Sequence, residues 1–173
     1  MDFDFSDDQE QLRDAVRKWV DKAYTFERRR SIAKDGGFSS DAWRELAELG
    51  LCGLYIPDAL GGLGMGPVEG MVVMEELGRG IVLEPLTQAL MAGAVLGHYA
   101  PQPLATQWAG PVASGERLVS LAYLERASRY QLDKCSTEAS GQDGAFTLHG
   151  TKSLVVAGDK ADAFLVSAQL DGN

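Results

Sequence analysis

Cysteine, histidine and basic residues are scarce in this chain of 173 residues, and each scarcity excludes a kind of site. Its two cysteines, Cys52 and Cys135, lie far apart and belong to no CxxC or Cys/His spacing typical of a zinc site. Its two histidines, His98 and His149, have no serine, cysteine or aspartate beside them in a catalytic pattern. We therefore expect no metal site, and structural or surface roles for both histidines.

Positive charge is also limited, because 16 lysines and arginines face 25 acidic residues and leave a formal net charge of −9. A nucleic-acid surface needs enough cations on one face to neutralise phosphates, so we expect no nucleic-acid partner. The basic cluster from Arg28 to Arg30 directly follows Glu27, and we interpret it as a solvated helix end rather than an anion site.

Long apolar runs are missing as well. No run approaches the roughly 20 residues that a membrane-spanning helix requires, and no charged-then-apolar leader opens the chain. We expect no membrane span, and a cytoplasmic protein whose thiols stay reduced.

The stretch from Trp43 to Gly80 carries the clearest structural pattern. Its first part places apolar residues on one helical face, and Gly50 supplies the left-handed conformation that ends such a helix. Gly66 and Pro67 are typical of the start of a second helix. The connection between the two helices is too apolar for a flexible linker. We expect its large residues to be buried, namely Leu51, Leu54, Tyr55, Ile56, Leu60 and Leu63.

Three features of this region invite a functional interpretation, and for each we prefer a structural one. The run Gly61–Gly66 resembles a phosphate-cradling loop, but it lacks a preceding strand and a following Gly-Lys-Ser/Thr, so we expect a buried interhelical loop. Met71 and Met74 are expected in the core rather than against a cofactor. The carboxylates expected to be solvated or capping are Glu75, Glu76 and Glu84.

Further helices are expected on both sides of this stretch. Ser6 and Gln9 form a capping box ahead of a helix that lasts to about Tyr24. Other helices are expected over 26–34, from Ser39 or Ser40 onward, over 85–97 and, more weakly, over 103–113. Gly93, with the alanines around it, indicates a close helix–helix contact.

The apolar period changes to that of strands after a turn at 114–116. Five strands are expected, over 117–124, 132–139, 145–150, 152–158 and 163–170, with a hairpin turn at Ser140–Gly144. The fold class is therefore α+β: an all-α helical bundle over 1–115, followed by the first strands of a truncated antiparallel β-barrel domain over 116–173.

Two segments taken together, ELGLCGLYIPDALGGLGMG and GTKSLVVAGDKADAFLVSA, resemble the acyl-CoA dehydrogenase family. The resemblance covers essentially the whole chain, as the family's amino-terminal helical domain and the start of its middle β-domain. Within that family, MDFDFS, YTFERRR, GPVEGMVVMEELGR and LERASRYQL are similar to the pimeloyl-CoA dehydrogenase small subunit type.

The resemblance implies an FAD-dependent oxidoreductase that dehydrogenates a CoA thioester between its α and β carbons. The thioester would be a medium-chain or dicarboxylic acyl-CoA, such as pimeloyl-CoA. The family's glutamate base lies in a carboxy-terminal helical domain, so no catalytic residue is assigned here and the chain alone is expected to be inactive. Implied partners are a large subunit in a homo- or hetero-oligomer and an electron-transfer flavoprotein or similar acceptor.

The family's flavin-contact pattern Y-x-V-T-E-P-G-A-G-S-D falls on 121–131, where Glu125 alone is clearly retained. Leu124 replaces the threonine whose hydroxyl contacts the flavin, and Arg126 replaces the proline. A second pattern, W-I-T after G-x-K, falls on 154–156. The resemblance thus assigns flavin contacts, which backbone N–H groups could make, to Leu121, Ala122, Tyr123, Leu124, Leu154, Val155 and Val156. It assigns substrate contacts to Tyr130, Arg126 and Arg129.

Alternatives remain open both for the two arginines and for the chain as a whole. Arg126 and Arg129 could form surface salt bridges to Glu125 or Asp133 rather than meet a phosphate or a second carboxylate of the substrate. The chain as a whole could be a non-catalytic, flavin-free structural subunit of a heteromeric dehydrogenase, or an independent binding protein with every strand paired and covered. The retained glycines and the G-x-K turn favour a flavin-binding chain.

Overall fold

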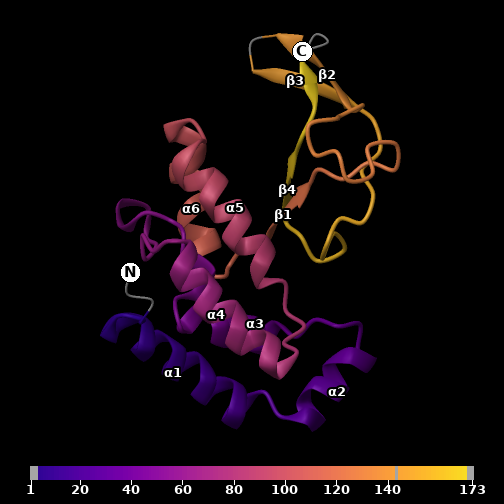
Figure 1. Cartoon of the computed structure of the whole chain (residues 1–173). Helices are drawn as coiled ribbons and strands as arrows, with labels where there is room; N and C mark the ends of the chain where they lie inside the picture. The colour runs from indigo at the N-terminus through magenta and orange to yellow at the C-terminus, as the bar shows by residue number, and fades with distance from the viewer. Residues whose placement is uncertain (1–3, 143, 171–173) are drawn as a thin grey trace. The chain divides into compact units, whose positions relative to one another are not determined.

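The computed structural model describes residues 4–142 and 144–170 (Figure 1). The chain divides into two compact units, Met1–Arg117 and Leu118–Asn173. The first is built of helices and the second of strands and loops. The first residues of the MDFDFS segment and Asp143 of the expected hairpin turn lie outside the described residues.

The described part of the first unit contains six α-helices and two short 3₁₀ turns. They are α1 (Asp7–Ala23), α2 (Phe26–Lys34), α3 (Ser40–Glu48), η1 (Leu51–Gly53), η2 (Asp58–Leu60), α4 (Pro67–Gly80), α5 (Leu86–His98) and α6 (Gln102–Ala113). The capping box before α1 is confirmed, since the Gln9 N–H donates to Ser6 Oγ at 3.3 Å and the Ser6 N–H donates to Gln9 Oε1 at 3.0 Å. Gly50, with φ 78°, ends α3 as expected, and Gly66 precedes Pro67 at the start of α4.

The apolar connection between α3 and α4 packs into the core of the helical unit. Leu51, Leu54 and Ile56 are fully buried, as expected, whereas Leu63 is 41% exposed, so the expectation was wrong there. A Cβ on Gly93 would lie 2.9 Å from Ile56 Cγ1. The close contact expected for this glycine is therefore made with the connection between α3 and α4 rather than with another helix.

The outer face of α4 corrects a second expectation. Met71 and Met74 are 53% and 37% exposed, so they do not belong to the core. Val72, Val73 and Leu77 take the buried face of the same helix instead. Because α4 packs along α1 (Figure 1), its neighbour rather than its own composition decides which apolar face is covered.

The cations of α2 are not solvated as a group. Arg28 donates from both terminal nitrogens to the carboxylate of Glu45 at 2.9 Å, and Arg29 donates to the carbonyl of Gly80 at 2.9 Å. Both arginines therefore tie α2 to other parts of the helical unit, which corrects the expectation of a solvated helix end.

The expectation for the carboxylates holds for Glu75, whose side chain is 66% exposed, but is wrong for Glu76 and Glu84. Glu76 is buried and forms ion pairs with Arg17 at 2.6 Å and Arg79 at 2.9 Å, which lower the pKa of its carboxyl. Glu84 is also buried and accepts from the Ser39 N–H at 3.2 Å, and its burial raises its pKa.

The second unit holds five short strands in its described residues: β1 (Val119–Ala122), β2 (Glu138–Gln142), β3 (Ala145–His149), β4 (Ala163–Val166) and β5 (Gln169–Leu170). β1 and β4 pair in parallel, with Val119 opposite Ala163. β2 pairs antiparallel with β3 and parallel with β5. The expected class, a helical domain followed by strands, is confirmed. Within 118–142 and 144–170, antiparallel pairing is confined to the β2–β3 hairpin.

Two of the expected strands differ from the structure. The strand expected over 132–139 begins only at Glu138, and the segment 152–158 contains no strand. Leu154 and Ala157 have φ values of 54° and 53°, which interrupt an extended conformation. The strand expected over 163–170 is split, because β4 and β5 belong to different sheets.

Three further expectations concern metal, histidine and membrane. Among residues 4–142 and 144–170, no three histidines, cysteines or acidic residues gather as a metal site would require. His98 contacts the carbonyl of Tyr55 at 3.2 Å, consistent with a structural role, and His149 is exposed on β3. No helix in the described part of the chain is long and apolar enough to cross a bilayer.

Candidate functional site

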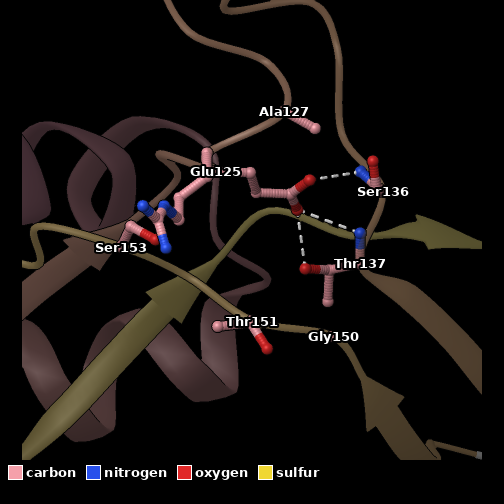
Figure 2. Close-up of a pocket in the computed structure, with 8 residues that line it drawn as sticks. Glu125, Ala127, Ser136, Thr137, Gly150, Thr151 and Ser153 are labelled. Carbon is pink, nitrogen blue, oxygen red and sulfur yellow. Dashed lines mark hydrogen bonds between the residues drawn. The ribbon is translucent and has the colours of Figure 1, made fainter.

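The loop that follows β1 is anchored by Glu125, whose side chain is buried. One oxygen of its carboxylate accepts from Lys152 Nζ at 2.7 Å, from Thr137 Oγ1 at 2.7 Å and from the Thr137 N–H at 2.9 Å. The other accepts from the Ser136 N–H at 2.6 Å (Figure 2). The Lys152 ammonium and these hydrogen bonds hold the pKa of Glu125 well below its usual range. Glu125 is therefore a fixed anion that organises the loop and is unsuited to accept a proton.

The G-x-K turn supplies the other half of this anchor. Gly150 lies so close to Thr137 that a Cβ there would stand 2.5 Å from Thr137 Oγ1 and 2.7 Å from its Cα. This close approach brings the Lys152 ammonium within 2.7 Å of the Glu125 carboxylate. The Lys152 side chain is only 9% exposed. Cys135 Sγ also lies 3.3 Å from Lys152 Nζ. Substitution of the glycine would push the turn away from the carboxylate.

Two hydrogen bonds bring the expected flavin-contact segments together. The Ser153 N–H donates to the Leu124 carbonyl at 2.8 Å, and Ser120 Oγ donates to the Val156 carbonyl at 2.9 Å. Segments 121–124 and 153–156, which are distant in the sequence, therefore lie side by side.

Two cavities adjoin the place where segments 121–124 and 153–156 meet, which we call the joint. The smaller, of about 250 Å³, is lined by residues that include Glu125, Thr137, Gly150 and Ser153 (Figure 2). The larger, of about 710 Å³, is lined by Leu124, Glu125, Arg126, Arg129, Tyr130, Ser153 and Leu154. The larger cavity thus unites two of the expected flavin-contact residues with all three of the expected substrate-contact residues.

The remaining expected flavin-contact residues do not line the larger cavity. Leu121 and Ala122 belong to β1, and Ala122 is buried. Tyr123 and Val156 are 37% and 55% exposed, and Val155 is half-buried. Their side chains are spread over β1 and the adjoining loop rather than gathered in one hollow.

Neither Arg126 nor Arg129 forms an ion pair with Glu125 or Asp133 in the part of the chain that the structure describes. Glu125 is already occupied by Lys152 and Thr137, so it has little capacity left for a guanidinium. The surface salt bridges considered above are therefore not formed.

Sequence reasoning missed the residues that build the anchor, namely Ser136, Thr137, Gly150, Lys152 and Ser153. Glu125 and Lys152 were both retained from the family pattern, which was the available signal. Their pairing could not be inferred, because 27 positions separate them.

Comparison with known proteins gives one matching family model, described as "Acyl-CoA dehydrogenase, N-terminal domain", over residues 6–116. The acyl-CoA dehydrogenase FadE27 of Mycobacterium tuberculosis is 30% identical over 99% of this chain and 45% of its own length. The benzylmalonyl-CoA dehydrogenase of Aromatoleum aromaticum is 26% identical over 98% of this chain and 45% of its own length.

A solved structure agrees with these relatives. The ChsE4–ChsE5 complex from M. tuberculosis contains a chain that is 28% identical, with a TM-score of 0.88 over 100% of this chain and 47% of that one. The chain thus spans about half the length of the relatives that it matches. Since the family model covers most of the chain, and the relatives align with the whole of it, the chain belongs to the acyl-CoA dehydrogenase family.

Proposed function

We propose that this chain forms part of an FAD-dependent acyl-CoA dehydrogenase that removes hydrogen from the α and β carbons of a CoA thioester. The observation that carries the proposal is the joint between the two motif segments, fixed by the Glu125–Lys152 pair and the Ser153–Leu124 hydrogen bond. Family membership supplies the reaction class, and the joint supports a role for this chain in holding the reactants.

The residues at the joint fit a flavin through their backbone. In residues 118–142 and 144–170, the N–H groups of Leu124, Leu154 and Val155 donate no hydrogen bond, so they are available to the oxygens and nitrogens of a flavin ring. When bound, FAD would supply the hydride acceptor. The side chains of Leu124 and Val156 offer apolar contact where the family pattern has hydroxyl groups, and Leu154 does so where the pattern has an aromatic ring.

We place the base that abstracts the α-proton outside this chain. Glu125 is saturated with hydrogen bonds and its pKa is lowered, so it cannot serve as that base. We therefore expect residues 1–173 alone to show no turnover. In the same proposal, residues 116–173 are the beginning of a β-domain, which agrees with the exposure of β3 along its whole length.

The finer parts of the proposal concern substrate, partner and compartment. We propose a dicarboxylic or medium-chain acyl-CoA such as pimeloyl-CoA, supported by the benzylmalonyl group in the name of one relative. A large-subunit partner is supported by the two-chain ChsE4–ChsE5 complex, and an electron-transfer flavoprotein is the proposed acceptor. A cytoplasmic setting agrees with the free thiols of Cys52 and Cys135.

One observation favours a second candidate, a flavin-free structural subunit of a heteromeric dehydrogenase. Leu124 stands where the family pattern has its flavin-binding threonine, and the loss of such a hydrogen bond typically weakens binding by about 1 kcal/mol. Several such losses together would leave flavin weakly held, while the fold and its interfaces persisted.

The visible absorbance of the purified protein, alone and with its partner subunit, separates the two candidates. The dehydrogenase proposal predicts that the full-length protein with its partner is yellow and that its colour bleaches when acyl-CoA is added, whereas a colourless complex would contradict it. As a graded test, Leu124→Thr restores the family's hydroxyl and should tighten flavin binding about fivefold, or about 1 kcal/mol. Leu132→Thr, at an exposed leucine of the same unit, is the matched control and should leave flavin affinity unchanged.

A further inference from the structure

Two cations of the larger cavity lack a carboxylate partner in a chain that has an excess of acid. The chain carries a net charge of −9, yet neither Arg126 nor Arg129 forms an ion pair in the described residues. The nearest carboxylate in sequence, Glu125, is occupied by Lys152, Thr137 and Ser136. The two guanidinium groups therefore retain their full capacity for an anion.

The backbone of Arg129 is an independent observation. Arg129 has φ 49°, a left-handed conformation that glycine adopts freely and that strains most other residues. The family pattern carries a glycine at this position, so the chain keeps the glycine-type backbone and places an arginine on it. Leu154, which lines the same cavity, has φ 54°. Residues held in strained conformations are found preferentially at ligand-binding sites.

The shape and lining of the cavity restrict the ligand. Leu124, Leu154 and Tyr130 border the two cations, and because Leu154 and Tyr130 are 84% and 97% exposed, the cavity is open to solvent. Its volume of about 710 Å³ is within the usual range of small-molecule sites. Such a cavity suits a molecule with an apolar chain and a terminal oxyanion. Arginine binds carboxylate and phosphate oxygens in a bidentate manner, which makes these two groups the natural anions.

We propose that Arg126 and Arg129 form an oxyanion site that binds a carboxylate or phosphate group of the CoA thioester. This inference rests on the proposed function, and it makes the site a determinant of which thioesters are accepted. The oxyanion has two sources in such a substrate: a second carboxylate at the far end of the acyl chain, or a phosphate of the CoA moiety.

The test measures binding of three thioesters to the purified protein by isothermal titration calorimetry. Pimeloyl-CoA and heptanoyl-CoA have acyl chains of equal length and differ in the terminal carboxylate, and heptanoyl-3′-dephospho-CoA lacks one phosphate. The variants are Arg126→Ala, Arg129→Gly and both conservative changes to lysine. Arg129→Gly suits the left-handed backbone, so the variant is expected to fold. Arg30→Ala, at an exposed arginine of α2, is the matched control for loss of one charge.

A carboxylate source predicts that Arg126→Ala and Arg129→Gly each weaken pimeloyl-CoA about tenfold, equivalent to about 1.4 kcal/mol, and leave heptanoyl-CoA unchanged. A source in the 3′-phosphate predicts an equal loss for both CoA esters and none for the dephospho ester. The lysine variants should retain part of the affinity in either case. A loss that is equal for all three esters points to the pyrophosphate and also supports the site.

The proposal is overturned if both arginine variants bind every ester as the unaltered protein does, if Arg30→Ala causes the same loss, or if the unaltered protein binds none of the esters. Flavin absorbance reports on the proposed function separately. A yellow protein without any arginine effect refutes the oxyanion site alone, whereas a colourless protein with an arginine effect refutes the dehydrogenase proposal alone.

Discussion

The helical unit and the strand unit are stabilised by different means. The helical unit has an apolar core, in which Leu46, Leu54 and Ile56 are fully buried. In the strand unit β3 is exposed along its whole length, and its prominent buried contact is the polar anchor around Glu125. The stability contributed by apolar burial is the sum of many small contacts, so it tolerates the loss of any one contact. A single polar anchor concentrates stability in a few atoms and is sensitive to the loss of any one of them.

The largest effect is expected from Glu125→Gln in the strand unit. This change leaves the buried Lys152 ammonium without its counter-ion, which is the costly way to break a buried pair. We expect the unit Leu118–Asn173 to lose protection of the Ser136 and Thr137 amides in hydrogen exchange, with little change in the helical unit. Glu138→Gln, at an exposed carboxylate in β2, is the control. The double variant Glu125→Gln/Lys152→Met should recover part of the protection. Equal protection in Glu125→Gln, Glu138→Gln and the double variant would contradict the role of Glu125 as the anchor.

The same carboxylate predicts a response to pH. Because the folded pKa of Glu125 is lowered, its ionised form contributes stability above the unfolded value of about 4.3. That contribution is lost as the pH falls from there through the lower folded pKa. Amide exchange at Ser136 and Thr137 should therefore accelerate below about pH 4 in the unaltered protein. In Glu125→Gln this acceleration should be absent.

In the helical unit the next largest effect is expected from Ile56→Ala. Ile56 is fully buried in the connection between α3 and α4 and lies against Gly93 of α5, so truncation should lower the free energy of unfolding by about 2–5 kcal/mol. Leu63→Ala removes the same kind of side chain from a position that is 41% exposed, and should change stability by about 0.5 kcal/mol or less. Urea denaturation of both variants checks the difference, and similar losses would show that the connection is not part of the core.

These two units also differ in how far their structure could be predicted from the sequence. In the helical unit the ends of helices follow from local signals, such as the Ser6–Gln9 capping box and the Gly66–Pro67 start of α4. The expectations were wrong where contact with another helix decides which side chains are buried. Met71 and Met74 have the character of core residues, but the face of α4 that packs along α1 belongs to other side chains.

In the strand unit the partners are distant in sequence, and the prediction was wrong at two segments: the strand expected over 132–139 begins only at Glu138, and 152–158 contains no strand. The apolar run in 152–158 is typical of a strand, yet Lys152 is held by Glu125 and the following backbone turns through the left-handed residues Leu154 and Ala157. Leu124, Arg126 and Leu154, which were expected to contact flavin or substrate, do line one cavity, and the contacts themselves stay a prediction. The family pattern marked those positions, whereas no local rule could have paired Glu125 with Lys152.

A smaller effect is expected from glycine substitutions that compare the two units directly. Gly150→Ala would place a Cβ 2.7 Å from Thr137 Cα, and the required shift should lower the free energy of unfolding by about 1–3 kcal/mol. Gly78→Ala in α4 meets no atom within 4 Å, and should stabilise the helical unit by up to about 1 kcal/mol through helix propensity. Thermal denaturation of each variant gives the sign. Destabilisation by Gly78→Ala, or none by Gly150→Ala, would contradict the packing described for that position.

The smallest effect is expected at the start of α1, where the helical unit relies on a local polar contact of its own. Ser6→Ala removes the oxygen that accepts the Gln9 N–H, and should lower the free energy of unfolding by about 1 kcal/mol. Ser140→Ala, at an exposed position of β2, is the control and should have an effect within about 0.5 kcal/mol. Because Gln9 also donates to Glu69 of α4 at 2.8 Å, loss of the cap should be felt beyond α1. Chemical-shift changes at Glu69 and Gly66 in Ser6→Ala would reveal that coupling. Their absence would limit the cap to a local role and leave apolar burial and ion pairs such as Arg17–Glu76 and Arg79–Asp21 as the contacts that hold α1 and α4 together.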